Sequence, residues 1–181
     1  MTSHDSSKTI FGFWVYLLTD FVLFATILAA YFVLHSSHNL MPLPFVLMQT
    51  LILLTCSLTS GLANIAAHRQ HKNATLWLFT LTFLLGSLFM WMEYAGFSLL
   101  IQTGSSWQAS AFLSAYFTLI GTHGVHVLFA LLWILVLLPP VCLHGITPIS
   151  LQRLTCLRMF WQFLSLIWVG IFTMVYLMGS Y

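Results

Sequence analysis

The sequence predicts an all-α membrane protein, a bundle of five transmembrane helices forming a single domain over residues 1–181. Hydrophobic residues make up 60% of the chain, charged residues only 4%, and the mean hydropathy is +0.99. A soluble domain could not cover so much apolar surface. The apolar residues form runs of about twenty or more, the length at which a helix rising ~1.5 Å per residue crosses a ~30 Å hydrocarbon core.

Each run is expected to form a helix, because a helix satisfies its own backbone hydrogen bonds in lipid and the runs lack the alternation of a membrane barrel. A short polar tail, residues 1–9, precedes the first span. The expected spans are Phe11 to Leu34, Phe45 to Ala67, Ala74 to Ile101, Ser110 to Leu138 and Leu157 to Met178.

Turn-forming residues separate the spans in order. Prolines 42 and 44 precede the second span, Gly104 follows the third, and the pair Pro139 and Pro140 ends the fourth. The longest connection, Pro139 to Thr155, is short and partly apolar, so we expect no attached soluble domain.

The basic residues predict the orientation of the bundle. The chain has five, and they fall before the first span, between the second and third, or between the fourth and fifth: Lys8, Arg69, Lys72, Arg153 and Arg158. Because cytoplasmic loops carry the excess of Lys and Arg, the N-terminus is expected in the cytoplasm and the C-terminus outside. So few scattered cations do not indicate a nucleic-acid-binding surface.

Two carboxylates stand inside the apolar runs. Asp20 lies in the first span and Glu93 in the third. An ionised carboxylate in hydrocarbon costs a few kcal/mol or more, so each is expected to face protein or water. Either residue could serve a proton-linked or headgroup-binding site, or a hydrogen-bonded acid could simply fix helix packing. Their different depths predict that the two do not touch.

The fourth span contains the segment GTHGVH, which places His123 and His126 three residues apart. Two such imidazoles could hold a metal or a haem. The wider pattern favours packing instead, because polar side chains recur every four residues and suit interhelical hydrogen bonds: Ser114, Thr118, Thr122 and His126. Gly121 and Gly124 would let a neighbouring backbone come close.

Several ordered motifs resemble subunit III of the haem-copper respiratory oxidases, most closely that of the cytochrome o ubiquinol oxidases. The opening helix FGFWVYLLTD, the segment MEYAGF around Glu93, and the last two spans carry the likeness, which runs from about Ile10 to the C-terminus. The resemblance also implies five spans with the N-terminus inside.

The resemblance implies an accessory subunit without an active site, in a bacterial inner-membrane complex that oxidises ubiquinol, reduces oxygen to water and pumps protons. Subunit I would hold the haems and copper and contact this chain directly, beside subunits II and IV. The chain would support assembly and sustained turnover and bind phospholipid in a cleft, with Glu93, His123 and His126 in its polar lining and no cofactor of its own.

The sequence departs from the family pattern at three polar positions. Relatives read WHFxDxxW in the last span, whereas this chain has Gln162 and Ser165, and Gln49 stands where quinol-oxidase relatives often have Glu. Each change removes a charge but keeps hydrogen-bonding ability. Gln162 and Ser165 are further candidates for the intramembrane polar set, beside Asp20, Glu93, His123 and His126. A cytochrome c oxidase subunit III and a small transporter remain alternatives.

Overall fold

Helices account for all the regular structure in the computed structural model, which describes residues 3–34, 42–102, 108 and 110–177. The helices are α1 (Ser3–Val33), α2 (Leu43–His68), α3 (Lys72–Gln102), α4 (Ala111–His144) and α5 (Pro148–Phe172), and α5 continues into the π-helical turn η1 (Thr173–Leu177). Each of the five α-helices contains a stretch long and apolar enough to cross a bilayer. The predicted number of spans is therefore confirmed.

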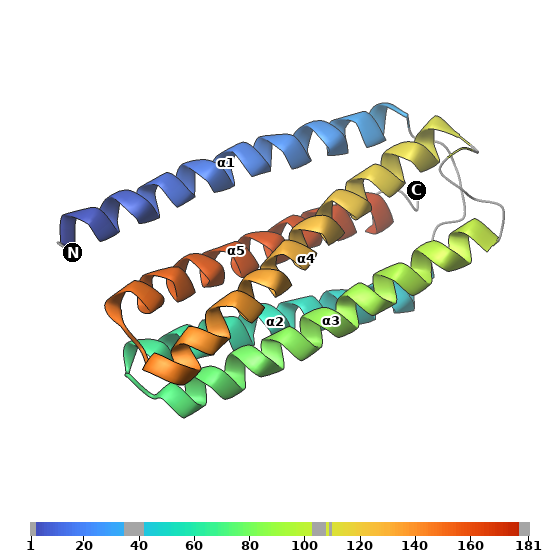
Figure 1. Ribbon diagram of the computed structural model, residues 1–181. Helices are drawn as coiled ribbons and strands as arrows, with labels where there is room; N and C mark the ends of the chain where they lie inside the picture. Colours follow the sequence, from blue (N-terminus) through green and yellow to red (C-terminus); the bar gives the residue numbers. More distant parts are fainter. Residues whose placement is uncertain (1–2, 35–41, 103–107, 109, 178–181) are drawn as a thin grey trace.

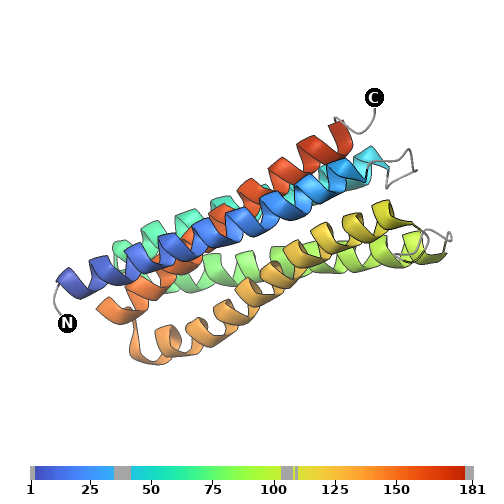
Figure 2. The ribbon, with the colours of Figure 1, turned by 90° about the horizontal axis from the view of Figure 1, so that it is seen from above.

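The helices run roughly side by side in three layers (Figure 1). Helix α1 packs on α4 and α5, and these two pack in turn on α3 and α2. Seen from above, α1 lies lengthwise over α5, with α4 to one side of it (Figure 2). The chain begins, and the α2–α3 and α4–α5 connections lie, at one end of the bundle (Figure 1).

Hydrogen bonds from side chains fix α2 in register with its neighbours. Toward α5, the Trp168 indole N–H donates to Thr50 Oγ1 at 3.0 Å and the Thr155 hydroxyl donates to Asn64 Oδ1 at 3.2 Å. Toward α3, the hydroxyls of Thr59 and Thr82 are 2.8 Å apart. Because lipid offers no competing water, such bonds stabilise helix association where hydrophobic burial contributes little.

The connection between α4 and α5 is much shorter than predicted. Pro139 and Pro140 lie inside α4, which continues to His144 and ends at Gly145, whose φ of 75° lies in the left-handed region. Each proline lacks a backbone N–H and so removes one helical hydrogen bond, which α4 tolerates in its last turns. The left-handed conformation of Gly145 ends the helix, because it turns the backbone away from the helical path. The expectation that Pro139 and Pro140 end the fourth span at Leu138 is wrong.

Helix α5 begins at Pro148 rather than Leu157. The Thr147 side chain accepts from the backbone N–H of Ser150, and the Ser150 hydroxyl accepts from Thr147, which together make a capping box with proline at the first helical position. Arg153 and Arg158 therefore lie on α5 and not in a loop.

Helix α1 also extends beyond its predicted start. The polar tail is helical from Ser3 onward, since no proline or glycine interrupts residues 3–11. The other ends agree within a few residues, and Met178, the predicted last residue of the fifth span, lies outside the described residues. All the basic residues lie in the half of the bundle where α1 begins, with Arg158 ten residues beyond the start of α5. Which end faces the cytoplasm stays a prediction.

Candidate functional site

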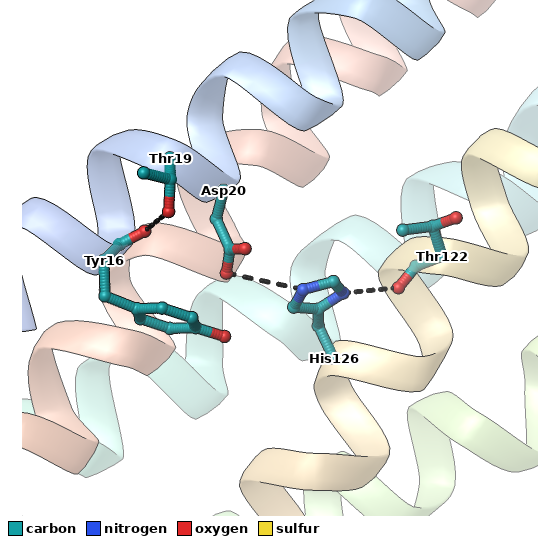
Figure 3. A network of polar contacts seen from close by, with 5 residues as sticks. All are labelled: Tyr16, Thr19, Asp20, Thr122 and His126. Carbon is teal, nitrogen blue, oxygen red and sulfur yellow. Dashed lines mark hydrogen bonds and ion pairs between the residues drawn. The ribbon is translucent and has the colours of Figure 1, made fainter.

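An ion-pair contact joins α1 to the middle of α4. Asp20 Oδ2 lies 3.4 Å from His126 Nε2 (Figure 3), and both side chains are largely buried. Tyr16 stands one turn before Asp20 on α1, and its ring lies on the same side as His126 (Figure 3). The contact is longer than a charge-assisted hydrogen bond of ~2.7–2.9 Å. The acid of the first span thus faces protein, and its partner is the second histidine of GTHGVH.

The protonation of His126 follows from its other contact. Nδ1 lies 2.7 Å from the Thr122 backbone oxygen, which can only accept, so Nδ1 carries a hydrogen. Nε2 is then the atom left to face Asp20, and at 3.4 Å the carboxylate oxygen Oδ2 has no hydrogen-bond partner among the described residues. An acid and a base placed together can form a neutral pair, which costs less in a bilayer than a lone charge.

The second polar cluster lies on the other side of α4, against α3. The Glu93 carboxylate is only 4% exposed, and its Oε1 lies 2.6 Å from where a Cβ on Gly124 would stand. Only glycine leaves room for a carboxylate so close to the helix. Glu93 Oε2 has no hydrogen-bond partner among the described residues.

His123 precedes Gly124 on α4 and is completely enclosed. Its Nε2 donates to the Leu164 carbonyl of α5 at 3.2 Å, and its ring centroid lies 5.0 Å from that of Trp168 and 5.8 Å from that of Phe89. His123 and Glu93 are therefore closed off inside the bundle, whereas Asp20 and His126 lie nearer its surface. The two membrane carboxylates contact different residues of α4.

The polar stripe of α4 acts mostly within the helix. The Thr118 hydroxyl donates to the Ser114 carbonyl of the same helix, and His126 Nδ1 donates to the Thr122 carbonyl. Within the described part of the chain, His126 also carries the stripe across to another helix through its contact with Asp20. That the whole stripe forms interhelical hydrogen bonds stays a prediction. At Gly121 no neighbouring atom lies within 4 Å of an added Cβ, and at Gly124 a side chain rather than a backbone approaches.

The three positions that depart from the family pattern have different surroundings. Ser165 is buried, and its hydroxyl lies within hydrogen-bonding distance of the Trp161 and Leu53 carbonyls. Gln49 is also buried, on α2. Gln162 is exposed on α5. The predicted polar set is thus divided between the bundle interior and its surface.

No group of three or more His, Cys, Asp or Glu in the described part of the chain could hold a metal ion. The three-residue spacing of two histidines also occurs at His68 and His71 and at His35 and His38. Of these two pairs, His35 and His38 lie outside the described residues.

Comparison with known proteins identifies the family. No family model matches the sequence. The chain is 46% identical to cytochrome bo(3) ubiquinol oxidase subunit 3 of Pseudomonas aeruginosa, over 98% of this chain and 89% of the relative. It is 42% identical to the protein of the same description from Pseudomonas putida, over 97% of this chain and 89% of the relative. The chain belongs to the haem-copper oxidase subunit III family. The resemblance predicted from its motifs is confirmed.

Membership in this family makes the chain a multi-pass membrane subunit of a bacterial respiratory oxidase. The chain is also similar to a relative whose description names a different electron donor. Cytochrome c oxidase subunit 3 of Bacillus sp. strain PS3 is 38% identical over 97% of this chain and 88% of the relative. The family assignment is shared by all three relatives, whereas their descriptions differ in donor.

Sequence reasoning missed two residues of structural weight. Gly86 on α3 receives the Trp161 ring, and Arg153 lies on α5. The Thr147–Pro148–Ser150 capping pattern could have placed Arg153 on the helix, whereas nothing in the sequence shows which aromatic side chain meets Gly86.

Proposed function

We propose that this chain is the accessory, non-catalytic subunit III of a proton-pumping ubiquinol oxidase. It contacts subunit I, which holds the haems and copper, and assembles with subunits II and IV in the bacterial inner membrane. Its role is to support assembly and sustained turnover of subunit I. The observation that carries this proposal is the 46% identity over nearly the whole chain with a bo(3) ubiquinol oxidase subunit 3.

Ubiquinol is favoured as the donor because the two Pseudomonas relatives are ubiquinol oxidase subunits, at 46% and 42% identity. Cytochrome c is the second candidate, supported by the Bacillus relative at 38%. The two donors are distinguished by chemistry, since a quinol reaches its oxidase through the bilayer and cytochrome c through water.

Purification through a tag on this chain from its native membrane tests the proposal. We expect a larger haem- and copper-bearing chain to co-purify, and the eluate to consume oxygen with ubiquinol but not with reduced cytochrome c. Removing the chain should leave an oxidase whose oxygen uptake declines during turnover. An eluate without haem overturns the proposal, and haem held by this chain alone overturns its non-catalytic role.

We further propose that a phospholipid binds between α1, α4 and α5 at the end where the chain begins. A cavity of about 520 Å³ opens there, with Arg153, Gln152, Trp133 and Tyr16 among its lining residues. A cation beside aromatic side chains at a helix end suits a phosphate headgroup at the level of the membrane interface.

Replacing Arg153 with glutamine should lower the phospholipid retained by the purified protein. One basic residue near a membrane surface contributes about 1 kcal/mol to binding of an anionic lipid, which corresponds to roughly 5-fold weaker retention. Phosphorus analysis after detergent washing measures the effect. Arg69→Gln removes a charge at the same end outside the cavity, so equal losses from both variants would contradict a specific site.

A further inference from the structure

Gln162 is a polar group that the described bundle leaves unsatisfied at mid-membrane depth. It is the fifteenth residue of α5, about 21 Å along a membrane span, Pro148–Val175, of about 42 Å. Its side chain is exposed, and no described residue hydrogen-bonds to it. An amide in hydrocarbon without a partner costs several kcal/mol, because lipid tails neither donate nor accept.

Other exposed polar side chains of the bundle solve this problem within their own helices. The hydroxyls of Thr19, Thr26 and Thr55 each donate to a backbone carbonyl three or four residues earlier, at 2.7 or 2.8 Å. Threonine can do this because its hydroxyl sits next to the backbone. Gln162 makes no such bond, so its partner must come from outside the described chain.

Arg158 stands one helical turn before Gln162 on the same face of α5. Its Nε is buried without a hydrogen-bond partner. No described carboxylate pairs with Arg158, since Asp20 contacts His126 on α4 and Glu93 lies against Gly124 of the same helix. The described bundle therefore supplies no anion for a cation that lies about 15 Å along the helix.

An apolar groove begins one helical turn beyond Gln162, at Leu166. It runs between α1 and α5, with a volume of about 450 Å³ and a lining that includes Phe21, Phe24, Leu28, Leu166, Val169 and Met174. Leu166 follows Gln162 by one turn, so the groove continues the face that carries Arg158 and Gln162. We call this continuous surface, from Arg158 through Gln162 to the groove, the α5 face.

We infer that the α5 face receives a transmembrane helix of another oxidase subunit that presents hydrogen-bond acceptors, one of them anionic, at the depth of Arg158 and Gln162. The inference rests on the proposed function, which supplies membrane-embedded neighbours. A lipid phosphate could meet Arg158, whose side chain leans toward the helix N-terminus. It could not meet the short side chain of Gln162 at mid-membrane depth, whereas a partner helix serves both.

Site-specific cross-linking in the assembled complex tests the inference. A photoreactive benzoylphenylalanine replaces Gln162, and a matched probe replaces Leu84, which is 60% exposed on α3 and lies about 18 Å from the same end of the bundle. We expect the probe at 162 to cross-link to an oxidase subunit and the probe at 84 to give no protein adduct. Absent adducts at 162, or lipid adducts only, in a complex that still co-purifies would overturn the inference and leave the proposed function standing. Failure to co-purify with an oxidase would overturn both.

Substitutions without a bulky probe provide a second readout. Gln162→Leu and Arg158→Met remove the polar groups but keep side-chain size, so the chain should still insert and fold. After detergent washing, we expect less of this subunit to stay with the complex. The loss should correspond to about 5- to 30-fold weaker association, the range for an interhelical polar contact. Leu84→Met serves as the control, and full retention of both α5 variants would also overturn the inference.

Discussion

Asp20→Ala is expected to destabilise the fold by about 3–5 kcal/mol, the cost of leaving one partner of a buried ion pair alone. The Asp20 carboxylate lies 3.4 Å from His126 Nε2, and the residue is 8% exposed. Without it, a protonated His126 would be an uncompensated cation between two membrane helices, and a neutral one would lose the partner of Nε2. The loss should affect helix α1 most, since among the described helices it packs mainly on α4 and α5.

A double-mutant cycle measures this coupling. Asp20→Asn keeps the shape of the side chain and can donate to a neutral Nε2, so we expect a smaller loss than for alanine. Combined with His126→Ala, Asp20→Ala should cost less than the sum of the two single changes, by about 0.5–3 kcal/mol. Unfolding of the purified protein in mixed detergent micelles, followed by circular dichroism, reports each value. Additive single changes would show that the contact contributes nothing to stability.

The spans could be predicted from the sequence, whereas their ends were placed less well. The length of an apolar run decides that a helix crosses the bilayer, because lipid permits few alternatives. The ends depend on local capping chemistry. The prediction ended the fourth span at the double proline 139–140, whereas the residues that end α4 and begin α5 are Gly145 and Thr147. Hydropathy alone also hides the polar first turns of α5, which carry Arg153.

The candidate site could be predicted only in outline. An ionisable residue in an apolar run has to face protein or water, and this requirement singles out Asp20 and Glu93 from the sequence alone. The sequence does not reveal the rotation of each helix, and this rotation determines that Asp20 meets His126 while Glu93 meets Gly124. It equally determines that Gln162 points outward whereas Ser165, three residues later, is buried.

Gly86→Leu is expected to destabilise the fold by about 3 kcal/mol, at the upper end of the usual cost of overpacking. A Cβ at this position would lie 2.8 Å from both Trp161 Cη2 and Leu131 Cδ2, well inside the ~3.5–4.0 Å optimum for carbon contacts. Trp161 is completely buried and cannot swing away. Gly86→Ala adds only the Cβ, so its cost should be lower, about 1 kcal/mol.

Gly61 on α2 provides the matched control, because no neighbouring atom lies within 4 Å of an added Cβ there. Gly61→Ala should be neutral or stabilising by up to about 1 kcal/mol through helix propensity. Trp161→Phe removes the Cη2 and Cζ2 atoms of the indole that crowd position 86, so Gly86→Ala should be better tolerated in its presence than in the native background. The same micelle unfolding assay measures the native protein and all five variants. Equal effects of alanine at 61 and 86 would contradict the close contact of Trp161 and Leu131 with Gly86, since helix propensity alone would then explain both.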